Sequence, residues 1–136
     1  MDILIDTQIL IWLGLLHPSL TKKTQELLTD TNNRVFVPEL ALLEISIKQK
    51  VGKLPQLTWD TNTIERQIIK DGFETMPVKI LHISYYNSIP LFADHKDPFD
   101  RLLVATAISE NMHFISSDPK FKQYQPLLLL IENQVR

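Results

Sequence analysis

Short aliphatic segments alternate with longer segments of helical periodicity along this chain, and this alternation limits the folds that the chain can adopt. The patterns predict strands over 2–6, 34–37, 73–78, 113–116 and 127–131. They predict helices over 7–16, 20–28, 39–51, 60–70, 80–89 and 98–111. Strands that alternate with helices form a mostly parallel sheet with helices on both faces, so the predicted fold class is α/β.

Residues with strong conformational preferences mark the ends of several predicted helices. Asp60 and Asp97 suit helix N-caps because a carboxylate accepts hydrogen bonds from the free N–H groups of a first turn. Pro98 suits the first helical position. Gly52 and Gly72 follow two helices as C-terminal residues, because glycine readily adopts the left-handed conformation found there. The helix that begins after Asp97 is the most clearly delimited element.

Composition excludes several classes of protein. The chain contains no cysteine, which excludes disulfides, thiolate zinc sites and a cysteine nucleophile. It has only 3 glycines and no glycine-rich phosphate loop, which argues against a nucleotide-dependent small-molecule enzyme. The longest apolar run, 9–16, is far shorter than the roughly 20 residues of a membrane helix. We therefore expect a single domain over 1–136 in the cytoplasm, with no membrane association.

Four carboxylates fall where the predicted fold can bring them together. Asp6 and Asp118 follow predicted strands, whereas Glu44 and Asp100 lie in the first halves of two predicted helices. In such a fold these positions can meet over one crevice beyond the carboxyl ends of the strands. Carboxylates without a cation repel one another, so the cluster is expected to hold a hard divalent ion, Mg²⁺ or Mn²⁺. A cation held in this way supports hydrolysis of phosphodiester bonds.

Two segments around these acids resemble signatures of PIN domains. They are Leu4-Ile-Asp6-Thr7-Gln-Ile-Leu-Ile-Trp12 and His95-Lys-Asp97-Pro-Phe-Asp100-Arg-Leu-Leu-Val-Ala105. Two others are similar to the middle and final signatures of the family: Glu44-Ile-Ser-Ile-Lys48 with Val51-Gly-Lys53-Leu, and Ser116-Ser-Asp118-Pro. The resemblance spans nearly the whole chain, and it is closest to VapC-type ribonuclease toxins of bacterial type II toxin–antitoxin pairs.

This resemblance implies a fold, an activity and partners. The fold would be a PIN-like three-layer α/β/α sandwich, and the protein would form a homodimer inhibited by a cognate antitoxin protein. The activity would be that of a Mg²⁺- or Mn²⁺-dependent endoribonuclease acting on structured RNA such as tRNA or rRNA. The family's acidic quartet would be Asp6, Glu44, Asp100 and Asp118, with Asp6 and Asp100 as the direct metal ligands. Gln8 and Leu43 depart from the usual histidine and tryptophan of these toxins, which bears on substrate contacts and packing.

The same residues also allow structural interpretations. Asp6 and Asp118 are suited to turns, and Asp100 could interact with a helix dipole while Asp97 caps the helix. Lys48, Lys53 and Arg101 could contact phosphate or lie on a solvated surface. The four histidines show no metal-ligand spacing.

Two other functions fit the sequence. One is a housekeeping PIN nuclease in RNA processing. The other is a catalytically silent PIN-like module that binds RNA or protein, which is motivated by the acidic character of the chain, with a net charge of −2, and by the departures at Gln8 and Leu43.

Overall fold

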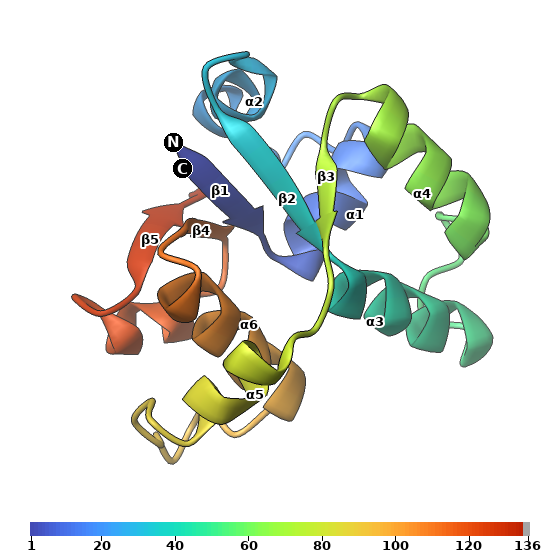
Figure 1. Cartoon of the computed structure of the whole chain (residues 1–136). Helices are drawn as coiled ribbons and strands as arrows, with labels where there is room; N and C mark the ends of the chain where they lie inside the picture. The colour runs from blue at the N-terminus through green and yellow to red at the C-terminus, as the bar shows by residue number, and fades with distance from the viewer. Residues whose placement is uncertain (135–136) are drawn as a thin grey trace.

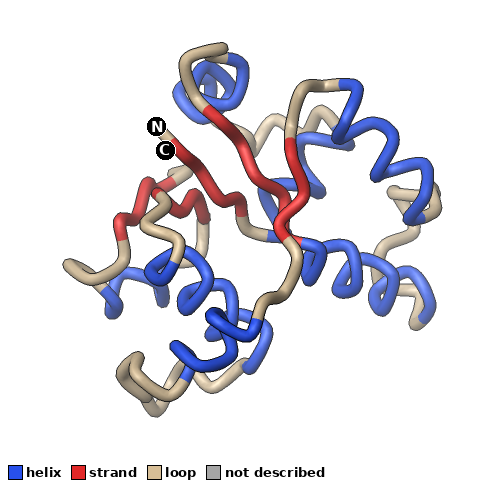
Figure 2. The backbone as a smooth tube through the Cα atoms, viewed as in Figure 1, coloured by secondary structure: helices blue, strands red, loops and turns tan. Residues whose placement is uncertain are grey.

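The computed structural model describes residues 1–134, and a parallel sheet forms its centre. The strands in this part of the chain are β1 (Asp2–Ile5), β2 (Arg34–Pro38), β3 (Glu74–Met76), β4 (His113–Ser116) and β5 (Leu129–Glu132). The helices are α1 (Thr7–Leu15), α2 (Lys22–Thr29), α3 (Glu39–Lys50), α4 (Thr61–Lys70), α5 (Ile80–Tyr86) and α6 (Pro98–Ser109), and a 3-10 helix, η1 (Pro119–Tyr124), follows β4. Figure 2 shows the strands in the middle of the molecule and the helices around them.

The order of the strands creates one switch point in the sheet. All neighbouring strands are parallel, and their order is β3-β2-β1-β4-β5. The chain extends the sheet from β1 through β2 to β3 and then returns to place β4 on the other side of β1. In open α/β sheets, ligands bind beyond the carboxyl ends of the strands at such a reversal. The predicted α/β class with a mostly parallel sheet is confirmed, and the crevice is expected after β1 and β4.

Alternating residues of the strands build two hydrophobic cores. Ile3 and Ile5 of β1 face a core shared with α1, α2, α3 and α4, whereas Leu4 faces a core shared with α6 and η1. In the same way, Ile115 and Phe114 of β4 lie in opposite cores. Figure 1 shows α5 and α6 on one side of the sheet and α1, α3 and α4 on the other. The molecule therefore has the three layers of an α/β/α sandwich.

Several predicted boundaries are wrong, and tertiary packing explains them. The predicted helix over 80–89 ends at Tyr86, because Pro90 disfavours helix at the preceding residue and Ile89 leaves the helix to enter the core. The last strand begins at Leu129 rather than 127, since Leu128 is buried beneath the sheet instead. The strand predicted over 73–78 shortens to Glu74–Met76, because Phe73 donates its N–H to Ile68 at the end of α4.

The helix η1 was not predicted from the sequence. It begins at Pro119 behind the N-cap Asp118, and it buries Phe121 and Tyr124. These two aromatic residues are three positions apart, which places them on one side of a 3-10 helix. A helix of only 6 residues with two buried side chains is too short to show a repeating pattern in the sequence.

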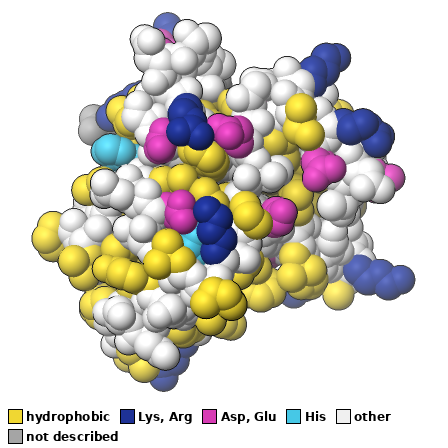
Figure 3. Space-filling model, in the orientation of Figure 1, with side chains coloured by type: hydrophobic (Ala, Val, Ile, Leu, Met, Phe, Trp, Pro, Cys, Tyr) yellow, Lys and Arg dark blue, Asp and Glu magenta, His cyan; other side chains and the backbone are white. Residues whose placement is uncertain are grey.

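Charged side chains are distributed over the surface without a dominant basic field. Figure 3 shows acidic and basic side chains interspersed on the face that it presents, with hydrophobic side chains gathered over α5 in its lower part. The exposed apolar residues of that region include Ile80, Leu81 and Ile83. No helix within residues 1–134 is long and apolar enough to cross a membrane.

Candidate active site

Asp6 lies at the switch point of the sheet, where β1 ends and α1 begins. Its backbone N–H donates to the carbonyl of Ile115 on β4, which fixes it beside the end of that strand. Its carboxylate is buried and accepts two short hydrogen bonds: Oδ1 from the backbone N–H of Thr7 and Oδ2 from Oγ of Ser116, each 2.7 Å long. Asp6 is therefore the N-cap of α1 and also a buried acid bound to the neighbouring strand.

Burial and neighbouring acids raise the pKa of Asp6 to about 7. Burial is the largest cause, because it disfavours the charged form of the carboxyl. The hydrogen bonds from Ser116 and Thr7 act in the opposite direction, whereas repulsion from Asp100 and Glu44 raises the pKa further. These repulsions show that the fold brings three of the four predicted acids into electrostatic contact.

Asp100 is presented by the first turn of α6, next to an acid with a different role. Asp97 caps this helix by accepting hydrogen bonds from the N–H groups of Phe99 and Asp100, as its sequence pattern predicts. The carboxylate of Asp100 is left for other contacts, and its Oδ2 lies 3.1 Å from Nε2 of His95. Burial raises the pKa of Asp100, and repulsion from Asp97 and Glu44 adds to this effect while His95 opposes it.

Glu44 approaches the other acids from α3. Its Oε1 accepts a hydrogen bond of 3.4 Å from Oγ1 of Thr7, the residue that follows Asp6. Its Oε2 pairs with Lys48 one turn later in α3, at 3.3 Å. The helix thus presents one acid and one base at the edge of the crevice.

Asp118 occupies a more distant position than the other three acids. It caps η1, with Oδ1 accepting a hydrogen bond from the N–H of Lys120. Its connection to the acids runs through Ser116, whose hydroxyl donates to Asp6 and accepts from the backbone N–H of Asp118. The structure therefore places Asp118 beside the crevice, in a capping role that its sequence context also allows.

Several residues of the site were not identified from the sequence. Thr7, Ser116 and His95 each hold one acid through a hydrogen bond. Ser116 and His95 lie within the segments that resemble PIN signatures. Their proximity in sequence to Asp118 and Asp100 was the one feature that could have indicated a role in the site. In contrast, Arg101 is not an RNA-facing residue: it is buried, donates to the carbonyl of Pro90 at 2.7 Å and lies over the ring of Tyr86.

The donor set suits a hard divalent cation. The available ligands are carboxylate oxygens. Burial and neighbouring negative charge raise the pKa of Asp6 and Asp100, and a bound cation would offset this destabilisation of their charged forms. Within residues 1–134, no three acidic or histidine side chains are yet close enough to hold a metal ion together.

The comparison with known protein families decides the family of this chain. A model of the PIN domain matches residues 3–126, which include β2, β3, β4 and most of β1, the switch point and all four acids. The chain belongs to the PIN domain family. The resemblance inferred from the sequence segments is thus confirmed. Comparison with curated protein sequences gives no significant match.

Solved structures share the fold of this PIN domain at low sequence identity. VapBC2 from Rickettsia felis, bound to a DNA fragment from its promoter, is 19% identical with a TM-score of 0.68, covering 97% of this chain and 98% of the other. DNA-bound VapBC from Salmonella typhimurium is 13% identical with a TM-score of 0.67, covering 98% and 99%. VapBC-5 from Mycobacterium tuberculosis, of the VapBC family of toxin–antitoxin systems, is 15% identical with a TM-score of 0.59, covering 98% of each chain.

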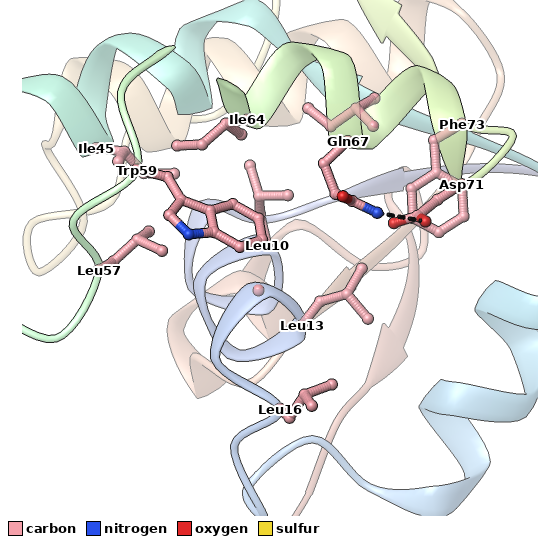
Figure 4. A pocket seen from close by; sticks show the side chains of 12 residues that line it. Leu10, Leu13, Leu16, Ile45, Leu57, Trp59, Ile64, Gln67, Asp71 and Phe73 are labelled. Carbon is pink, nitrogen blue, oxygen red and sulfur yellow. Dashed lines mark hydrogen bonds between the residues drawn. The ribbon is translucent and has the colours of Figure 1, made fainter. Parts of the chain in front are cut away.

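An apolar cavity separate from the acids lies between α1, α3 and α4. It has a volume of about 450 Å³ and is enclosed by α1, α3, α4 and the segment before α4. Figure 4 shows Leu10, Leu13 and Trp59 around it, with Gln67 hydrogen-bonded to Asp71 at its edge. Leu16, at the end of α1, also lines it and is 87% exposed. This cavity contains none of the four acids, so its chemistry is that of an apolar contact surface.

The raised pKa of Asp6 predicts an unusual dependence of stability on pH. Between about pH 4 and 7 the folded protein keeps a proton on Asp6 that the unfolded chain has lost, so the free energy of unfolding falls as pH rises through this window. The difference between pKa values of 3.8 and about 7 corresponds to roughly 4 kcal/mol. Urea unfolding of the metal-free protein at a series of pH values measures this slope.

The variant Asp6→Asn tests the assignment, because asparagine does not titrate. Its stability should vary much less between pH 4 and 7, whereas Asp30→Asn, at an exposed helix end, should keep the wild-type slope. Equal slopes for wild type and Asp6→Asn would show that another group is responsible.

Proposed function

We propose that this PIN domain is a metal-dependent endoribonuclease and the toxin of a type II toxin–antitoxin pair of the VapC type. The observation that carries the proposal is the gathering of Asp6, Asp100 and Glu44 at the switch point of the sheet, around a carboxyl that is strongly perturbed by burial and charge. Strongly perturbed acids in the crevice of an α/β sheet are typical of functional sites. The fold shared with VapBC structures supports the toxin assignment.

In this proposal Asp6 and Asp100 hold one Mg²⁺ or Mn²⁺ ion. When bound, the ion supplies a Lewis acid that polarises the phosphodiester and lowers the pKa of an attacking water. The carboxylate of Asp6 is oriented by Thr7 and Ser116, and each of its oxygens keeps a lone pair beyond the hydrogen bond that it accepts. Asp100 is oriented by His95 in the same manner.

Glu44 and Asp118 complete the proposed site. Glu44 lies beside Thr7 and is suited to orient the attacking water and accept its proton. Asp118 sits on the far side of Ser116 and holds the N-terminus of η1 in place. Cleavage of structured RNA such as tRNA or rRNA would leave a 5′-phosphate and a 3′-hydroxyl. Lys48, paired with Glu44, is positioned to contact phosphate at the rim of the crevice.

We also propose that the apolar cavity between α1, α3 and α4 receives an apolar segment of the antitoxin. The cavity is open and lined mainly by aliphatic and aromatic side chains, among them the largely exposed Leu16. An exposed apolar surface of this kind is typical of a protein–protein contact. The assembly of similar folds into toxin–antitoxin systems supports an antitoxin as the occupant.

The proposed nuclease activity predicts the loss of RNA cleavage in two variants. Asp6→Asn and Asp100→Asn should each reduce cleavage by roughly 100-fold or more, because each removes one charged ligand of the cation. Purified protein is incubated with total cellular RNA in Mg²⁺ or Mn²⁺, and fragments are resolved on denaturing gels. EDTA should abolish cleavage by the wild type.

Asp30→Asn is the matched control for these variants, since it makes the same change at an exposed helix end. It should cleave RNA at the wild-type rate and arrest growth when expressed without antitoxin. Folded wild-type protein that leaves every RNA intact with either metal would contradict the proposal and favour a silent binding module. Cleavage without growth arrest would favour a housekeeping nuclease.

The antitoxin proposal predicts that a charge at the end of α1 weakens the complex. Leu16→Asp should lower the affinity for the product of the neighbouring gene by roughly 30-fold, the size of a hot-spot loss. Leu16 has a φ of 51°, a conformation that aspartate tolerates well, so the variant should fold. Leu91→Asp, at a position that is 70% exposed elsewhere, is the matched control. The affinities are measured by calorimetry. If Leu16→Asp and Leu91→Asp bind the antitoxin equally well, the antitoxin does not occupy the cavity beside Leu16.

The exposed apolar side chains of α5 support the expected homodimer. Ile80 and Ile83 project from this helix into solvent, which is costly for a surface that remains uncovered. Replacing both residues with aspartate should convert a dimer into a monomer, which sedimentation of the purified protein would detect. A wild-type protein that sediments as a monomer at micromolar concentration would refute the homodimer.

A further inference from the structure

His95 and Tyr124 form a buried polar pair beside the acids. His95 belongs to the loop before α6 and is 3% exposed, and Tyr124 ends η1 and is 1% exposed. Nδ1 of His95 lies 2.8 Å from the hydroxyl of Tyr124. The histidine ring also packs edge-on against Phe121, with ring centroids 5.0 Å apart. The ring is therefore held on one side by a hydrogen bond and on another by aromatic packing.

The second nitrogen of His95 faces Asp100. Nε2 lies 3.1 Å from Oδ2 of that residue. A charged carboxylate only accepts hydrogen bonds, so the nitrogen of His95 that faces Asp100 serves it as a donor. In the neutral ring with its proton on Nε2, Nδ1 is left to accept a hydrogen bond from the hydroxyl of Tyr124. Tyr124 thus gives the ring a second hydrogen bond on the side away from Asp100.

The two hydrogen bonds of His95 fix the orientation of the carboxylate of Asp100, one of the acids of the crevice. Oδ2 of Asp100 is occupied by His95, and among the described residues no hydrogen bond is made to Oδ1. Asp97 has a different role, since its Oδ1 accepts both hydrogen bonds from the first turn of α6. Metal-binding carboxylates commonly depend on such partners for their orientation and affinity.

From this geometry we infer that His95 is a positioning residue for the divalent-cation site and that Tyr124 holds the histidine ring in place through Nδ1. The inference rests on the proposed function, because it concerns the cation that Asp6 and Asp100 would hold. His95 touches neither RNA nor the ion; it holds Asp100 with one oxygen free to bind. The readout that follows is the affinity for metal, measured without substrate.

The other end of α6 carries a matched arrangement that serves as a control. His82 is completely buried, its Nδ1 accepts from the backbone N–H of Lys79 at 3.1 Å, and its Nε2 lies 3.2 Å from Glu110. This histidine also donates to a carboxylate and supports the packing of α5 on α6. Glu110 is the C-cap of α6, at the opposite end of the helix from Asp100. A purely structural role of a buried histidine should therefore be visible equally at both positions.

The experiment compares Mn²⁺ binding to purified full-length protein by calorimetry, with thermal unfolding measured on the same samples. His95→Asn removes the donor to Asp100, because the asparagine amide reaches only the position of Nδ1; it should weaken Mn²⁺ binding by roughly 10- to 100-fold. His95→Gln places an amide nitrogen near the position of Nε2 and should recover most of the affinity. His82→Asn should lower the unfolding temperature but leave Mn²⁺ affinity unchanged.

Several outcomes would overturn the inference. Wild-type affinity in His95→Asn, or an equal loss in His95→Gln, would show that the histidine acts only through packing. A loss of affinity in His82→Asn equal to that in His95→Asn would show the same. If His95→Asn does not fold, Tyr124→Phe replaces it: this variant deletes one oxygen and should weaken binding several-fold, and unchanged affinity would contradict the role of Tyr124. Absence of Mn²⁺ binding to folded wild-type protein would instead refute the proposed function itself, and this inference with it.

Discussion

The hydrogen bond from Ser116 to Asp6 joins the ends of the two strands between which the order of the sheet reverses. A carboxylate buried at this point destabilises the fold unless donors surround it, and the protein provides one donor from β4 and one from α1. The same hydroxyl accepts from Asp118 and so begins η1. The crevice, the start of α1 and the path of the chain after β4 all depend on this one contact.

Acids that are close in the sequence have different roles in this protein: some cap helices, and others face the crevice. Asp97 satisfies the N–H groups at the start of α6, which leaves the carboxylate of Asp100 for the crevice. Asp118 caps the start of η1, and Tyr124 at the other end of that short helix is hydrogen-bonded to His95, which in turn contacts Asp100. η1 is therefore connected to both Asp6 and Asp100, through Ser116 at one end and His95 at the other.

The sequence was informative where local chemistry determines structure. The caps at Asp60 and Asp97, the terminating glycines and the aliphatic strands all have a local physical cause, and they were predicted. The three gathered acids could be placed because strand ends and helix starts meet in a parallel sheet. Ser116 and Tyr124 could not, because each acts through a side chain 110 or 29 positions away in the sequence. Such contacts depend on packing in three dimensions, which also decided where α5 and β5 begin and end.

The central strand acquires its second neighbour late in synthesis. Ile3 of β1 pairs with His113 of β4, so β1 remains an edge strand until most of the chain has been made. Until then β1 lacks the strand that carries Ser116, whose hydroxyl donates to the buried carboxylate of Asp6. Asp6 therefore obtains both of its hydrogen-bond donors only near the end of synthesis, although it is the sixth residue to be made.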